Sequence, residues 1–169
     1  MRIADDHMYH GSALIQIAEH PQFTSINSFK IKSEVFHNAF GINDGIGVYL
    51  KYASKPKGGF KEYVFTFTSE HLAQLARIDE VTEKLFLALV CVAGKEICAL
   101  PYADLIQLIE RRRKDNKGDE DQYTLLLTLP KDSAFRVYVS PVGTKGKALG
   151  KPLRIARNRF PNSLFEAKA

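Results

Sequence analysis

The sequence predicts an α+β fold in which a mixed, largely antiparallel sheet has about three helices packed on it. Two patterns predict it: short segments of alternating apolar and polar residues, as at 62–68, and segments with apolar residues three and four positions apart, as at 102–109. Hydrophobic residues make up 45% of the 169 residues and charged residues 25%, which is enough apolar material for one core. We therefore expect a single globular domain over residues 1–169.

The first half of the chain is expected to form a helix, three strands and a second helix. Asp5 and Asp6 offer capping oxygens for a helix over 7–19, and Ser69 offers one for a helix that ends near residue 77. The three strands between these helices are rich in β-branched and aromatic residues, and they are expected at 26–36, 46–53 and 62–68.

Residues 85–92 are apolar on both faces, which is typical of a central strand that is covered on both sides. A turn at Gly94 would lead into a strand at 97–100, and this hairpin would place Cys91 opposite Cys98. Adjacent antiparallel strands constrain a disulfide poorly, so we expect two buried, reduced thiols. The N-terminus lacks the apolar core of a secretion signal, and together with the thiols this predicts a cytoplasmic protein.

The second half of the chain is expected to add a helix, a strand pair and an edge strand. The apolar spacing over 102–109 predicts the helix, and the basic run at 111–114 lies where a helix C-terminus favours cations. Strands at 122–129 and 135–139 would pair antiparallel, and 153–156 would add an edge strand.

The charge of the chain is uneven. The formal net charge is +5, yet residues 1–110 carry 10 Lys and Arg against 13 Asp and Glu. Residues 145–169 carry seven Lys and Arg against one Glu. A basic C-terminal segment that begins near residue 145 therefore carries a larger positive charge than the net charge of the whole chain. Such an asymmetry favours an anionic partner.

Nucleic acid is the partner that these cations favour, because clustered Lys and Arg side chains release counterions from a phosphate backbone. Arginine, asparagine and phenylalanine are interleaved over 154–160, a composition that suits phosphate contact together with base stacking. We therefore expect a protein that binds DNA or RNA and is non-enzymatic or catalytically degenerate. The candidate binding residues are Arg111, Arg112, Arg113, Lys114, Lys145, Lys147, Lys151, Arg154, Arg157 and Arg159.

A divalent-metal nuclease is the alternative. The order helix, three strands, helix, strand resembles the core order of restriction-endonuclease-like nucleases. That resemblance implies Mg²⁺ held by an acid on one strand and by an acid two residues before a lysine on the next, which would give catalytic roles to Glu34 and Lys51. Tyr49 stands where the second acid is expected, so Asp44, or Glu62 on the following strand, would have to replace it. Without such a site, Glu34 and Lys51 would form a cross-strand ion pair.

Other sites have little support in the sequence. His7 and His10 would share a helix face near Asp6, but zinc needs three or four ligands, and no Cys-x-x-Cys or His-Glu-x-x-His occurs. Two basic, glycine-containing loops at 55–59 and 143–147 either contact phosphate or are merely solvated. We therefore expect no resident metal and no cofactor outside the nuclease alternative.

A protein-interaction module is the third expectation. Residues 160–165 are apolar and contain Pro161, so they must dock either on their own domain, which is more usual, or on a partner. A second copy of the chain would be one such partner, giving a homo-oligomer. No apolar run reaches the length of a membrane helix, so no membrane partner is expected.

Overall fold

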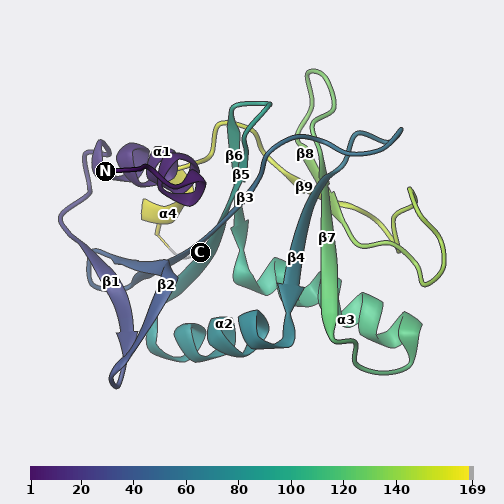
Figure 1. Ribbon diagram of the computed structural model, residues 1–169, viewed down its shortest axis with the longest axis horizontal. Coiled ribbons are helices and arrows are strands. Elements are labelled where there is room, and N and C mark those ends of the chain that lie inside the picture. The colour runs from purple at the N-terminus through teal and green to yellow at the C-terminus, as the bar shows by residue number, and fades with distance from the viewer. Residues whose placement is uncertain (168–169) are drawn as a thin grey trace.

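Two β-sheets face each other and enclose most of the apolar side chains (Figure 1). The computed structural model describes residues 1–167. Its helices are α1 (Asp5–Ala18), α2 (Ser69–Val81), α3 (Tyr102–Asn116) and α4 (Asn162–Phe165). Its strands are β1 (Ile26–Ile31), β2 (Glu34–Ile42), β3 (Ile46–Ala53), β4 (Tyr63–Thr68), β5 (Lys84–Cys91), β6 (Glu96–Pro101), β7 (Gln122–Thr128), β8 (Phe135–Tyr138) and β9 (Leu153–Ile155). The predicted α+β fold is confirmed, although the strands form two sheets and the described residues contain four helices.

The first sheet has five strands in the order β1-β2-β3-β5-β6. β3 and β5 are parallel, and the other neighbours are antiparallel. Along β5, Leu87 and Leu89 face the core between the sheets, whereas Ala88 and Val90 face the opposite side. The prediction of a strand covered on both faces is therefore confirmed.

The second sheet is antiparallel and has the order β4-β7-β8-β9. Tyr63, Phe65 and Phe67 alternate along β4 and are buried in the core between the sheets. The strand pair and the edge strand predicted in the second half of the chain are β7, β8 and β9. β4 belongs to this sheet and does not pair with β3, so the three strands predicted before α2 do not form one continuous sheet.

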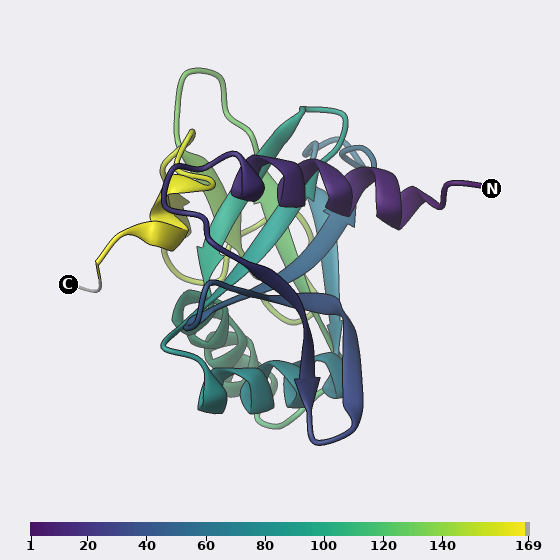
Figure 2. The ribbon, with the colours of Figure 1, turned by 90° about the vertical axis from the view of Figure 1, so that its left-hand side faces the viewer.

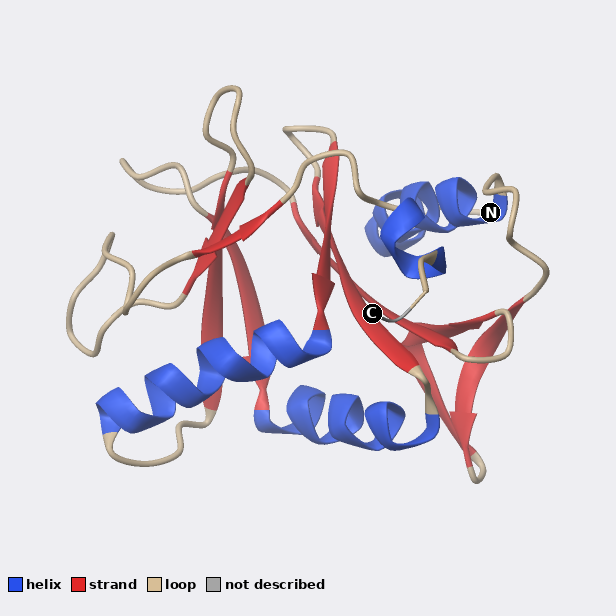
Figure 3. Cartoon of the chain, turned by 180° about the vertical axis from the view of Figure 1, so that it is seen from behind, coloured by secondary structure: helices blue, strands red, loops and turns tan. Residues whose placement is uncertain are grey.

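Two helices close the space between the sheets at one end. α2 and α3 run along the lower end of both sheets (Figures 1 and 3). Leu75 and Ile78 of α2 and Leu105 and Leu108 of α3 complete the shared core, which spans both sheets. No helix within residues 1–167 is long and apolar enough to span a membrane.

The outer face of the first sheet is covered by α1 and α4, and Figure 2 shows α1 crossing its strands. Ala13 and Ile17 of α1 pack there against Phe160 and Leu164 of the C-terminal segment. Phe160 is only 9% exposed and Leu164 is fully buried. Residues 160–165 therefore dock on their own domain.

Three local predictions are wrong. Residues 26–36 are part of a hairpin of two strands and not one strand, because the chain turns at Lys32, which has a left-handed conformation (φ 55°). The segment contains no Gly or Pro that would have predicted this turn. The cap of α2 is Thr68 and not Ser69: the backbone N–H of His71 donates to Thr68 Oγ1 at 3.2 Å. Asp5 lies in the first turn of α1 and makes no capping hydrogen bond.

Cys91 and Cys98 are buried, free and on adjacent strands, as predicted. They are not directly opposite, since Cys98 pairs with Leu89, and Cys91 pairs with Glu96. Burial raises the pKa of Cys91 to about 12 and also raises the pKa of Cys98. Both thiols therefore stay protonated near neutral pH, and their burial favours a structural role.

Candidate nucleic-acid interface

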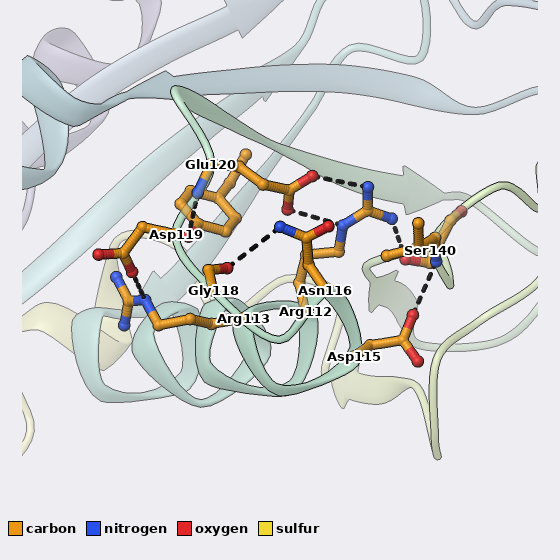
Figure 4. Close-up of polar contacts among 10 residues, drawn as sticks. Arg112, Arg113, Asp115, Asn116, Gly118, Asp119, Glu120 and Ser140 are labelled. Carbon is orange, nitrogen blue, oxygen red and sulfur yellow. Dashed lines mark hydrogen bonds and ion pairs between the residues drawn. The ribbon is translucent and has the colours of Figure 1, made fainter.

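Arg112, in the last turns of α3, is bound tightly within the fold (Figure 4). Its Nε and Nη2 donate to the two carboxylate oxygens of Glu120, each at 2.8 Å, and its Nη1 donates to the carbonyl oxygen of Ser140 at 2.8 Å. The hydrogen bonds of this pair raise the pKa of Arg112 and lower the pKa of Glu120. Arg112 thus joins the segment after α3 to the end of β8.

Arg113 is also paired. Its guanidinium contacts the carboxylates of Glu110 and Asp119 and lies 5.7 Å from the ring centroid of Tyr123. These contacts hold the end of α3, where Lys117 terminates the helix in a left-handed conformation. Arg112 and Arg113 would have to give up ion pairs before they could bind phosphate.

Two arginines of the C-terminal segment are paired in the same way. Arg157 binds both carboxylate oxygens of Glu96, and its Nη1 donates at 3.2 Å to two carbonyl oxygens of the β7–β8 turn. Arg159 forms an ion pair with Glu166. Arg157 therefore fastens the C-terminal segment to β6 of the first sheet.

The other six predicted cations have no ion-pair partner within residues 1–167; they are Arg111, Lys114, Lys145, Lys147, Lys151 and Arg154. Arg111 Nη1 donates to the carbonyl oxygen of Lys151 at 2.6 Å. This contact brings the end of α3 against the loop between β8 and β9, and Figure 1 shows both at the same end of the molecule. Arg111 of the first basic stretch and Lys151 of the second therefore lie side by side, whereas Arg157 and Arg159 are bound to β6 and beside α4.

A third basic segment joins them. The loop between β3 and β4 carries Lys55, Lys57 and Lys61, all exposed, and its Phe60 lies against Gly146 of the β8–β9 loop. A Cβ atom on Gly146 would lie 2.3 Å from atoms of the Phe60 ring, so a larger residue there would displace the ring. Gly146 also has a φ of 77°, which favours glycine. The basic loop surface, as we call it, consists of Lys55, Lys57, Phe60, Lys61, Arg111, Lys145, Lys147, Lys151 and Arg154.

The two loops concentrate positive charge. Residues 54–61 and 141–154 contain seven of the 24 Lys and Arg residues and no Asp or Glu. The rest of the chain has 17 cations against 19 acids, so these two segments account for the basic character of the protein. The excess charge is therefore local and not spread over the surface.

Like charges also face each other at the start of β9. Arg154 pairs with Arg136 across β8 and β9, an arrangement that costs stability. The Arg136 guanidinium lies 4.7 Å from the ring centroid of Tyr138. The neighbouring acid Glu62 accepts a hydrogen bond from the hydroxyl of Tyr138. An anion bound beside Arg154 would reduce the repulsion.

Sequence reasoning treated the two loops separately and missed Phe60. Its signal is present in the sequence: Gly58, Gly59, Phe60 and Lys61 place an aromatic residue in a basic turn that has no apolar periodicity. The contact between Phe60 and Gly146 joins residues 86 positions apart in the chain. No local pattern predicts such a pairing.

The residues of the nuclease alternative do not converge. Glu34 is the first residue of β2 and Asp44 lies two residues beyond its end, so the strand, about 26 Å long, separates them. Glu34 pairs with Arg77 of α2 at 2.7 Å and not with Lys51, so the expected cross-strand ion pair is wrong. Divalent ions hold their oxygen ligands at about 2.0–2.6 Å, which this arrangement does not allow.

Metal-binding groups are likewise not assembled. Within residues 1–167, no cluster of three or more His, Cys, Asp and Glu side chains could hold a metal ion. His10 packs edge-on against Tyr52, with 5.5 Å between the ring centroids, and its pKa is lowered by burial. His10 therefore belongs to the packing of α1 on the first sheet.

Lys51 lies between the two sheets. Its Nζ donates to the carbonyl oxygen of Thr66 on β4, lies 3.4 Å from Nδ1 of His71, and is 4.7 Å from the ring centroid of Phe67. Burial lowers the pKa of Lys51 from 10.5 to about 8, and it also lowers the pKa of His71. Lys51 thus connects β3 to an edge of the second sheet.

Replacing Lys51 by methionine is expected to change how stability depends on pH. Between pH 8 and 10.5 the unfolded chain still binds the Lys51 proton that the native protein has lost, so the contribution of Lys51 to stability rises with pH. Partial exposure screens the effect, so we expect the stability of the wild type relative to Lys51→Met to rise by about 1 to 2 kcal/mol. Urea unfolding of both proteins across this range measures the difference. A constant difference would contradict the prediction.

Comparison with known proteins finds no relative: no protein-family model, no curated protein and no solved structure matches the chain.

Proposed function

We propose that the chain binds nucleic acid through the basic loop surface and has no catalytic activity of its own. The observation that carries the proposal is the contact of Arg111 with Lys151, which unites two basic stretches that are distant in the sequence. The cations that the fold uses, such as Arg112 and Arg157, are held in bidentate ion pairs. Those of the basic loop surface are not, so they are available to phosphate groups.

Clustered cations bind polyanions because each phosphate that they neutralise releases a condensed counterion. The basic loop surface has eight lysines and arginines, seven of them in two acid-free segments, and so meets this requirement. Loops suit the task because their side chains can follow an irregular backbone.

The other two functions have weaker support. The nuclease alternative and its Mg²⁺ cofactor need Glu34, Asp44 and Lys51 in one place, and these residues lie apart. The protein-interaction alternative was based on residues 160–165, and that segment packs on the first sheet.

Binding of labelled single-stranded DNA, single-stranded RNA and duplex DNA across a salt series tests the proposal. We expect log affinity for single strands to fall with log salt at a slope of about 3 to 5, since each contacted phosphate contributes about 0.7. Fluorescence anisotropy from about 50 to 200 mM salt measures the slope. The same samples with Mg²⁺ should leave the oligonucleotides intact. No binding at the lowest salt would overturn the proposal, and cleavage would favour the nuclease alternative.

A further inference from the structure

Phe60 is the only exposed aromatic residue among the 7 Tyr and 11 Phe, all of which lie within residues 1–167. Its side chain is 61% exposed, whereas the other aromatic residues are buried or half-buried. An exposed phenylalanine costs solvation free energy and contributes little to the core. A role in binding another molecule would explain why this side chain is exposed.

The ring lies against Gly146, and lysines adjoin both residues in the sequence. A Cβ atom on Gly146 would lie within 2.7 Å of three atoms of the ring, so the ring packs closely on this glycine. Lys145 and Lys147 flank Gly146 in the sequence, and Lys61 follows Phe60. Three cations are therefore next in sequence to the two residues of this contact.

We propose that Phe60 is a base-stacking platform and that single-stranded nucleic acid is the ligand of the basic loop surface. This inference rests on the proposed function and adds the class of ligand. A single strand has unstacked bases that can lie on an aromatic ring while its phosphates contact the neighbouring lysines. A duplex keeps its bases stacked internally and presents only their edges. Every base has a π-face, so this surface tolerates different sequences.

Phe60→Ala is expected to weaken single-strand binding by roughly 5- to 150-fold, the range that loss of one stacked base produces. The salt slope should not change, because no charge is removed. Duplex affinity should also stay within about twofold. Val142→Ala is the matched control: Val142 is a 44% exposed apolar residue of the β8–β9 loop without a π-system, and its loss should have no effect.

An abasic oligonucleotide identifies what the ring contacts. It keeps the phosphates and lacks the bases, so the wild type should bind it as weakly as Phe60→Ala binds the normal strand. Phe60→Ala should bind both oligonucleotides equally. A Phe60→Ala protein that still distinguishes them would overturn the stacking proposal.

Phe60→Trp gives a direct signal, because the chain has no tryptophan. Normal DNA or RNA should quench its fluorescence and be bound with retained affinity, whereas the abasic strand should quench little. Thermal unfolding midpoints equal to that of the wild type would show that all variants are folded. If Phe60→Ala binds single strands like the wild type, stacking is wrong and nucleic-acid binding stands. If the wild type binds neither strands nor duplex, the proposed function itself fails.

Discussion

Replacing Lys145, Lys147, Lys151 and Arg154 together by glutamine is expected to weaken single-strand binding by about two to three orders of magnitude at about 0.1 M salt. Each contact on a single strand releases about 0.7 of a counterion, so the salt slope should fall by up to about 3 units. The four side chains are exposed and make no hydrogen bond or ion pair within residues 1–167, so the fold should be little affected. Anisotropy titrations at several salt concentrations measure both quantities.

A pair of lysines at the far end of the molecule provides the control. Lys30 and Lys32 are exposed and two positions apart, as are Lys145 and Lys147, and the β1–β2 hairpin that carries them lies opposite the basic loops (Figure 1). The double glutamine change at Lys145 and Lys147 should weaken binding about tenfold or more. The same change at Lys30 and Lys32 should leave affinity within about twofold. Equal losses would mean that total charge matters and that the basic loop surface is not the site.

Much of the fold could be predicted because its elements carry local signals. The alternation of Tyr63, Phe65 and Phe67 identifies β4, and the double-sided apolar run identifies β5. The division into two sheets could not be predicted. Alternation shows which side chains of a strand share a face, but it does not show which other strand pairs with that strand. The hairpin between β1 and β2 was missed because its left-handed residue is Lys32, which carries no turn signal.

For the candidate site, the sequence predicted only which segments of the chain are rich in cations. The basic stretches were visible in the sequence, but the contact between Arg111 and Lys151, 40 residues apart, was not. Which cations are available depends on partners that no local pattern reveals: Glu96 binds Arg157 across 61 residues. A charge run therefore shows where cations are concentrated, and the fold determines which of them are held in ion pairs.

Arg157→Ala is expected to destabilise the protein by about 2 to 3 kcal/mol and to lower Tm by about 4 to 12 °C. The side chains of Arg157 and Glu96 are each only 26% exposed, so truncation leaves a half-buried carboxylate without its bidentate partner. Two carbonyl oxygens of the β7–β8 turn lose a donor as well, and the guanidinium no longer covers the Phe135 ring, 5.1 Å away. Thermal and urea unfolding measure the loss.

Arg154→Ala is the matched comparison, because it removes the same side chain three residues earlier in the chain, from an exposed position without an ion pair. It should change the free energy of unfolding by less than about 0.5 kcal/mol. Because the substitution removes the repulsion between Arg154 and Arg136, we expect this change to be a small increase in stability. The effects on binding should be reversed: Arg154→Ala lowers affinity for single strands, whereas folded Arg157→Ala protein binds like the wild type. If Arg157→Ala instead weakened binding without lowering stability, its ion pair with Glu96 would have to open on the nucleic acid. The division between structural and binding arginines would then be wrong.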